Sequence, residues 1–211
     1  MSGSISATVI RATRLDADGA AATGANAYIV SEGFVRITAT PRYTESPSTV
    51  ILDIWGDVVV NEPENPEMLG VELQVGLIGV DPALVAFLAE GCTRIDDSVP
   101  VGLRLRAGRD TTARYALETW TDALGGPDDC FGTQWHHWAF TRVRAGVLSA
   151  WTFEDASLEF TVSGYTQPAL ASWGDGPHDP APGEAVTVGD FAVHSLTLVP
   201  PPEPTNGLAS L

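Results

Sequence analysis

Apolar and polar residues alternate most regularly in the first half of the stretch Val71–Gly91. One face of this segment is apolar and the other is polar or small: Val71, Leu73, Val75 and Leu77 against Glu72, Gln74 and Gly76. An alternation with period two is the pattern of a strand that buries one face. The segment is therefore predicted to be a strand whose apolar side chains enter a core.

The second half of the same stretch changes from the period of a strand to that of a helix. Asp81 is suited to the N-cap, and Pro82 fits the first helical position, where no N–H is needed. Apolar residues then recur at helical spacing, at Leu84, Val85 and Leu88. Gly91 is expected to end this helix, at about residues 82–90, as its C′ residue. So short a helix is not stable alone in water, so we expect it to dock on a sheet.

No other segment has so clear a helical pattern, and the rest of the chain is predicted to form about ten short strands. The main candidates are Ser4–Leu15, Ala27–Val30, Phe34–Tyr43, Thr49–Val60, Val99–Arg106, Ala113–Thr121, Trp135–Ala145, Val147–Thr152, Ser157–Ser163 and Ala185–Val199. Thr49–Val60 is either a strand pair or one strand kinked at Gly56-Asp57. The segment from Trp135 to Thr152 is expected to be a hairpin around Ala145-Gly146.

These elements predict a mainly β fold, a β-sandwich or barrel with one short flanking α-helix. A single domain is expected over residues 1–199, since neither an internal repeat nor a domain boundary is evident. The proline-rich segment 200–211 is expected to be disordered.

Acidic residues outnumber basic ones by 27 to 11, which gives a formal net charge of −16. Ordinary nucleic-acid binding needs a basic surface, so this balance argues against that class of function. It leaves open a protein that passes nucleic acid without holding it. No apolar run approaches the roughly 20 residues of a membrane-spanning helix, and the N-terminus lacks the features of a secretory signal.

The adjacent histidines His136 and His137 are the first candidates for a metal site. Neighbouring residues on a strand point to opposite faces, so the two rings are not expected to ligate one ion. His178 lies in a loop whose Gly, Pro and Asp residues are typical of turns. His194-Ser195 lies in a predicted strand, and the chain has no Gly-x-Ser-x-Gly elbow.

Other patterns also fail to indicate catalysis. The chain has no lysine, which removes a phosphate-binding loop ending in Gly-Lys-Ser/Thr. The carboxylate pairs Glu154-Asp155 and Asp128-Asp129 fall in predicted loops, where solvated turns explain them. Cys92 and Cys130 are interpreted as two reduced cysteines, with a disulfide left open. We therefore expect no enzyme activity, no metal and no cofactor.

Several segments, taken in order, resemble the major tail proteins (tail tube proteins) of long-tailed phages of actinobacteria, the siphophages. The strand and helix of Val71–Gly91 are the first of these. The other similar segments are Arg11–Asp16, Glu32–Val35, the turn Tyr43–Ser46, Cys130–Gly132, Phe153–Gly164 and Ser172–Pro177. Together they cover most of residues 5–200.

The resemblance implies a structural virion protein with a β-sandwich of the tail-tube type. Six copies would form a ring whose inner strands close a continuous barrel, and stacked rings would form the tail tube. The tube would conduct phage DNA from the capsid to the host cell during ejection, without binding it specifically. The implied partners are further copies of the chain, the tape-measure protein, the tail terminator and distal tail or baseplate proteins. The implied location is the virion tail, which would be assembled in the host cytoplasm. No membrane partner is implied.

Candidate contacts between subunits come from the residues that flank Thr49–Val60. That segment is apolar on both faces, and a strand buried on both sides needs a partner beyond its own sandwich. The turn Thr44–Ser48 and the acidic loop Asn61–Pro66, which two prolines bar from a central strand, are expected to reach neighbouring subunits. The candidate contact residues are Glu45, Asn61, Glu62, Glu64 and Asn65.

Candidate lumen-facing residues lie on the polar face of the strand Phe34–Tyr43. They are Arg36, Thr38 and Thr40. A negative wall would repel phosphates and let DNA slide, so Arg36 and Arg42 are the residues most at odds with a conducting role.

Two other functions stay open. A tail tube of a related injection particle, such as a gene-transfer agent, would share the same architecture. A soluble β-sandwich that binds a ligand or carbohydrate would instead place five aromatic residues on one exposed face: Trp120, Trp135, Trp138, Trp151 and Trp173.

Overall fold

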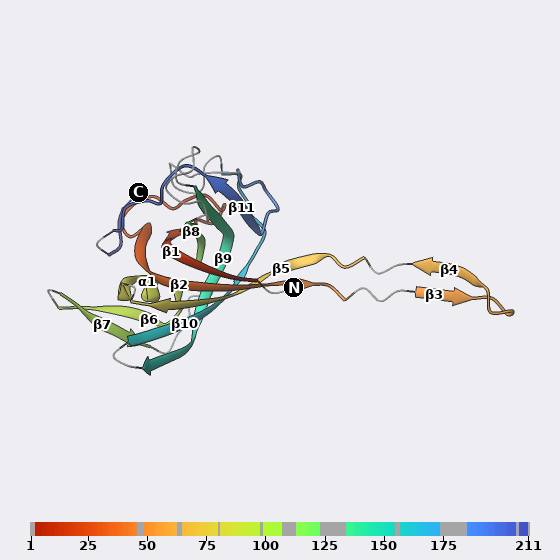
Figure 1. The fold of residues 1–211 in the computed structure, drawn as a ribbon, viewed down its shortest axis with the longest axis horizontal. Coiled ribbons are helices and arrows are strands. Elements are labelled where there is room, and N and C mark those ends of the chain that lie inside the picture. The colour runs from red at the N-terminus through yellow and green to blue at the C-terminus, as the bar shows by residue number, and fades with distance from the viewer. Residues whose placement is uncertain are drawn as a thin grey trace.

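The computed structural model of the chain describes residues 3–45, 49–62, 65–79, 81–97, 99–106, 113–122, 134–154, 157–173, 185–205 and 207–210. Over these ranges the protein is mainly β with one short helix, as the sequence predicts (Figure 1). No helix within them is long and apolar enough to cross a bilayer. The elements are β1 (Gly3–Arg14), β2 (Tyr28–Tyr43), β3 (Thr49–Leu52), β4 (Val58–Glu62), β5 (Met68–Ile78), α1 (Pro82–Leu88), β6 (Cys92–Asp97), β7 (Val99–Leu105), β8 (Arg114–Asp122), β9 (Trp135–Glu154), β10 (Ser157–Thr166) and β11 (Ala192–Thr197).

The main sheet is antiparallel and closes on itself. Its strand order is β10-β5-β2-β1-β8-β9-β11, and β10 pairs with β9 as well as with β5. The strands from β10 to β9 in this order form the closed part, and β11 adds to its outside along β9. Closure removes most of the unpaired strand edge at which another chain could add.

The 20-residue strand β9 makes this closure. Its first part pairs with β8 and β11, and the part from Val143 onward pairs with β10. The predicted hairpin around Ala145-Gly146 is therefore wrong, because the strand continues through both residues. A Cβ at Gly146 would stand 2.5 Å from Val162 Cγ1 and 2.8 Å from the Ser163 carbonyl oxygen. The glycine thus serves the close approach of two strands rather than a turn.

Alternate side chains of the closed strands fill the interior together with α1. The four residues predicted to face inward from β5 are at most 5% exposed: Val71, Leu73, Val75 and Leu77. Residues of the neighbouring strands complete the same cluster, among them Ile10, Ile29, Val35, Ile37, Leu117, Phe140, Val143 and Val162. Each such side chain contributes roughly 1.5–3 kcal/mol when it is fully buried, so this cluster is the main source of stability.

Helix α1 begins at the residues that the sequence indicates. Asp81 is the N-cap, and its Oδ1 accepts a hydrogen bond from the N–H of Ala83 at 2.7 Å. Pro82 takes the first helical position. Three apolar residues of the helix are fully buried in the main core: Leu84, Val85 and Leu88. A helix of seven residues is held by such packing and not by its own hydrogen bonds.

The end of α1 differs from the prediction. The helix stops at Leu88, and its C-cap Ala89 has an extended backbone with φ −104° and ψ 122°. Ala89 forms a parallel bridge with Gly146, and the N–H of Glu90 donates to the Gly146 carbonyl oxygen at 2.7 Å. This pairing with β9 draws the chain out of the helix early, so Gly91 is not the C′ residue. It lies instead in the turn before β6, with a left-handed φ of +80°.

The proline-rich segment, predicted to be disordered, is docked along β2 at Thr205 and Ala209. Strand β5 pairs with β2 only from Phe34 onward, which leaves the edge of the preceding residues without a strand. The N–H of Thr205 donates to the Val30 carbonyl oxygen at 3.0 Å, and the N–H of Ala209 donates to that of Tyr28 at 2.8 Å. The segment is held because these main-chain groups need hydrogen-bond partners, a requirement that composition does not reveal.

Replacing Leu88 with alanine is expected to lower the free energy of unfolding by about 2–5 kcal/mol, because a fully buried leucine leaves a cavity. Leu105→Ala is the matched control, since Leu105 is 53% exposed and its loss should change stability by less than about 0.5 kcal/mol. Urea unfolding of both variants measures the difference. Equal stability of the two variants would contradict the docking of α1.

Candidate functional site

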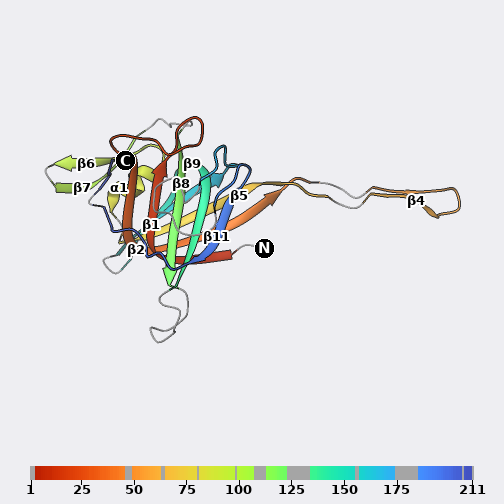
Figure 2. The same ribbon diagram turned by 90° about the horizontal axis from the view of Figure 1, so that it is seen from above.

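Strands β3 and β4 form a separate hairpin that projects from the closed sheet (Figures 1 and 2). Of the two alternatives left open by the sequence, Thr49–Val60 is therefore the strand pair. Its turn is fixed by Asp53, whose Oδ1 accepts hydrogen bonds from the N–H groups of Trp55 and Asp57 at 2.8 and 2.9 Å. Gly56 supplies the left-handed conformation in this turn, with φ +86°.

Apolar side chains cover both faces of the hairpin and are exposed. Exposure is greatest at the turn, with 87% for Ile54 and 81% for Trp55. The strands carry further apolar residues that are at least 50% exposed: Val50, Ile51, Leu52, Val58 and Val59. Successive residues of a strand point to opposite faces, so the described chain covers neither face. Exposed apolar surface of this kind is typical of contact sites for other proteins, membranes or ligands.

The candidate contact residues before and after the hairpin lie at its base. Glu45 and Asn65 are exposed there, and Glu64 lies outside the described residues. The two chain segments are joined by the N–H of Thr44, which donates to the Glu67 carbonyl oxygen at 2.8 Å. The two segments are therefore paired at Thr44 and Glu67, and residues 46–48 of the predicted turn lie outside the described residues.

Asn61 and Glu62 are placed differently from the prediction. The sequence assigns them to an acidic loop, but they belong to β4 and pair with Val50 and Thr49 of β3. The prolines that were expected to exclude a strand follow Glu62 and do not interrupt the pairing. Two of the candidate contact residues are consequently part of the projecting hairpin itself.

A second surface is the outward face of β2, β5 and β10. Along β2, Val35 and Ile37 are fully buried, whereas Arg36 is exposed and Thr38 and Thr40 are partly exposed. Polar residues continue this face across the neighbouring strands, with Glu72 and Gln74 on β5 and Thr161 and Ser163 on β10 in register with it. The candidate lumen-facing residues therefore lie together on one polar sheet face.

Opposite charges accompany the arginines of this polar face. Arg42 Nε donates to Glu72 Oε2 at 2.9 Å. The Oε1 atom of Glu159 lies 3.2 Å from the position that a Cβ on Gly76 would take, on the same face as Arg36. An exposed pair of this kind contributes little to stability, and the carboxylate of Glu72 partly neutralises the positive charge of Arg42 on this face.

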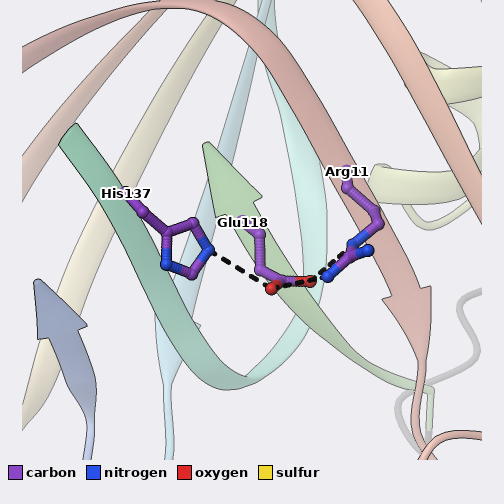
Figure 3. Close-up of polar contacts among 3 residues, drawn as sticks. All are labelled: Arg11, Glu118 and His137. Carbon is purple, nitrogen blue, oxygen red and sulfur yellow. Dashed lines mark hydrogen bonds and ion pairs between the residues drawn. The ribbon is translucent and has the colours of Figure 1, made fainter. Parts of the chain in front are cut away.

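A buried polar group connects three strands on the face of the sheet turned away from the main core (Figure 3). Arg11 on β1 lies directly opposite Glu118 on β8, and its Nε and Nη2 donate to the two carboxylate oxygens at 2.7 and 2.8 Å. His137 on β9 approaches the same carboxylate, with Nε2 3.3 Å from Oε1. All three side chains are at most 5% exposed, so we call them the buried triad.

Trp120 encloses the buried triad and increases its isolation from water. The centre of its ring lies 5.3 Å from the guanidinium carbon of Arg11 and 4.7 Å from the centre of the His137 ring. Burial disfavours an ionised carboxyl, but the charge of Arg11 and the contacts of both partners outweigh it and hold the pKa of Glu118 below its ordinary value. The carboxylate is therefore ionised at neutral pH and joins β1, β8 and β9 beneath the surface.

His136 and His137 point to opposite faces of β9, as the sequence predicts. His137 points to Glu118 on the face of β9 turned away from the main core, while His136 is partly exposed on the other face and lies beside His194 of β11. Burial, followed by the nearby His136 and His137, lowers the pKa of His194. Across the described part of the chain, no three side chains of His, Cys, Asp or Glu gather as metal ligands.

Cys92 is a buried free thiol whose pKa is raised by burial, and its potential partner Cys130 lies outside the described residues.

Comparison with known proteins gives no relative from which a function could be transferred. No protein-family model matches the chain, and searches of curated proteins and of solved structures found no match. The projecting hairpin and the polar face therefore carry the functional argument, together with the sequence resemblance.

Replacing Glu118 with glutamine is expected to destabilise the fold by about 3–5 kcal/mol at neutral pH, because Arg11 loses its buried countercharge. The unfolded pKa of a glutamate is about 4.3 and the folded pKa of Glu118 is lower, so its stabilisation is complete above the unfolded value. This stabilisation is lost as the pH falls through the folded pKa of Glu118. The free energies of unfolding of the parent and the variant should therefore become more similar in that pH range. Urea unfolding at a series of pH values measures this difference.

Glu159→Gln on the polar face is the control for that substitution, with an expected change below about 0.5 kcal/mol. A Glu118→Gln variant as stable as the parent at every pH would show that the buried triad does not support the fold.

Proposed function

We propose that this chain is the repeating structural subunit of a phage tail tube, in which six copies form a ring and rings stack into the tube. The observation that carries the proposal is the projecting hairpin, which is apolar on both faces and exposed. The sequence resemblance to the major tail proteins of siphophages supports it independently. A tail tube of a gene-transfer agent falls under the same proposal.

The projecting hairpin suits a partner that is another copy of this chain. An isolated two-stranded hairpin is at best marginally stable in water, so its apolar faces need a surface to pack against. An element that projects from one part of a subunit and docks on a different part of the next makes a heterologous contact. Such contacts produce closed rings when the rotation closes and filaments when it does not. A tube of stacked rings needs contacts that close each ring and contacts that repeat from ring to ring along the tube.

Charge supports the role of a conduit. With 16 net negative charges on each copy, a ring of six would carry about 96. In this proposal the polar face with Arg36, Thr38 and Thr40 lines the lumen, and DNA slides along it without specific binding. The tape-measure protein, the tail terminator and the distal tail or baseplate proteins would be the further partners. The protein would act in the virion tail, without an enzyme activity or cofactor of its own.

A carbohydrate-binding module has less support from the aromatic residues. That function needs the five tryptophans Trp120, Trp135, Trp138, Trp151 and Trp173 on one exposed face. Trp120 is fully buried and Trp173 is 5% exposed, whereas Trp151 is 54% exposed. The five side chains therefore do not form a shared aromatic platform.

The double substitution Ile54→Ser and Trp55→Ser is expected to prevent tube growth and leave the closed sheet folded. Both side chains lie at the exposed turn of the projecting hairpin and make no part of the core. Electron microscopy and sedimentation of concentrated protein measure growth, and thermal melting measures folding. Val188→Ser, which removes another side chain that is 63% exposed, is the control and should still assemble. Normal tubes from the double variant would exclude the hairpin as an assembly contact.

Assembled tubes are expected to show no measurable affinity for duplex DNA at physiological ionic strength, where the Debye length is about 8 Å. The net negative charge and the pairing of Arg42 with Glu72 both reduce attraction for phosphates. Sedimentation of tubes with labelled duplex tests this expectation. Salt-sensitive co-sedimentation that disappears in the Arg36→Glu variant would instead indicate a protein that holds DNA.

A further inference from the structure

Two histidine rings meet where β11 pairs with β9, on the same sheet face as Trp138. His136 Nδ1 lies 3.0 Å from His194 Nε2, and the ring centres are 5.2 Å apart with 22° between their planes. In the register of these strands, His194 faces Trp138 and stands two residues from the position opposite His136. His194 is exposed and His136 partly so. The fold thus brings together two imidazoles that are 58 residues apart in the chain.

From this geometry we infer that His136 and His194 form a two-histidine site for a divalent transition metal of the Cu²⁺ or Ni²⁺ class. Imidazole nitrogens bind such ions at about 2.0–2.1 Å, so two nitrogens at a right angle stand about 2.9–3.0 Å apart. A tetrahedral angle requires about 3.4 Å at the same bond length. The separation of 3.0 Å therefore fits neighbouring positions of a square-planar or octahedral ion.

The ring orientation shows what binding would change. Nearly coplanar rings with their nitrogens facing each other share one hydrogen, so one nitrogen donates and the other accepts. An ion would replace this hydrogen, and each ring would turn by about 45° to aim its lone pair at the metal. Water completes the coordination, since the described residues offer no third His, Cys, Asp or Glu ligand.

The fluorescence of Trp138 can report metal binding at this site. The centre of its ring lies 4.5 Å from that of His194, with 36° between the planes. A bound Cu²⁺ ion would therefore quench Trp138 fluorescence at short range. His137, although adjacent in sequence, points to the opposite face of β9 toward Glu118 and is not part of the site.

The test uses the full chain without an affinity tag, in a His178→Ala background so that His178 cannot contribute. Cu²⁺ is titrated by calorimetry and by tryptophan fluorescence, and the bound ion is examined by electron paramagnetic resonance. The expected result is saturable binding of one ion with two nitrogen ligands. Loss of even an outer-shell partner costs about 10–100-fold in metal affinity, so His136→Ala and His194→Ala should each weaken binding at least about tenfold.

Controls separate this site from general copper binding. Trp138→Phe should retain the affinity and lose most of the quenching. The double variant His136→Ala with His194→Ala measures binding elsewhere on the chain, and near-ultraviolet circular dichroism checks that each variant is folded. If an alanine variant unfolds, His136→Gln and His194→Gln replace it and are expected to show the same loss of affinity.

Three results would overturn the inference. The first is an affinity unchanged by either substitution. The second is a loss caused by one substitution alone, which would mean a single-histidine contact. The third is the absence of saturable binding up to about 100 μM Cu²⁺.

Discussion

The closed sheet depends on one close contact, where β9 passes the end of α1 and continues along β10. Gly146 lies at this point with no room for a side chain between Val162, Ser163 and the Leu88 carbonyl oxygen. The carbonyl oxygen of Gly146 also accepts the N–H of Glu90 and so directs the chain out of the helix. A single glycine therefore lies where the closing strands, the end of the helix and the main core meet.

Local signals explain the parts of the fold that the sequence predicts well. The alternation along β5 and the Asp81-Pro82 start of α1 each depend on residues within one element, so they can be recognised without knowing the fold. Gly91 and Gly146 are the counterexamples. Gly91 does adopt a left-handed conformation, but pairing with β9 ends the helix before it. Gly146 looks like a turn residue because nothing in its neighbours reveals that β10 lies against it.

The contrast between local signals and long-range pairing also explains why the sequence indicates the apolar surface of the hairpin but not the buried triad. The apolar residues on both faces of β3 and β4 are visible in the sequence, and they stand apart from a body that completes its core without them. The buried triad was missed because Arg11 and Glu118 meet only through the pairing of β1 with β8. One signal was present: Glu118 shares a face of its strand with Ala116 and Trp120, which is an unusual setting for a solvated acid. The pairing of His136 with His194 depends likewise on a strand register that no local pattern contains.

The docking of the proline-rich segment along β2 has a consequence for the timing of folding. Val30 and Thr205, which are joined by hydrogen bonds in both directions, are separated by 175 residues. A ribosome adds about 5–20 residues per second, so the edge of β2 is synthesised roughly 10–35 seconds before the residues that cover it. Until those residues are made, the main-chain groups of Tyr28 and Val30 lack the hydrogen-bond partners that they have in the complete fold. This edge of β2 is therefore among the last to be covered, after the strands that close the sheet.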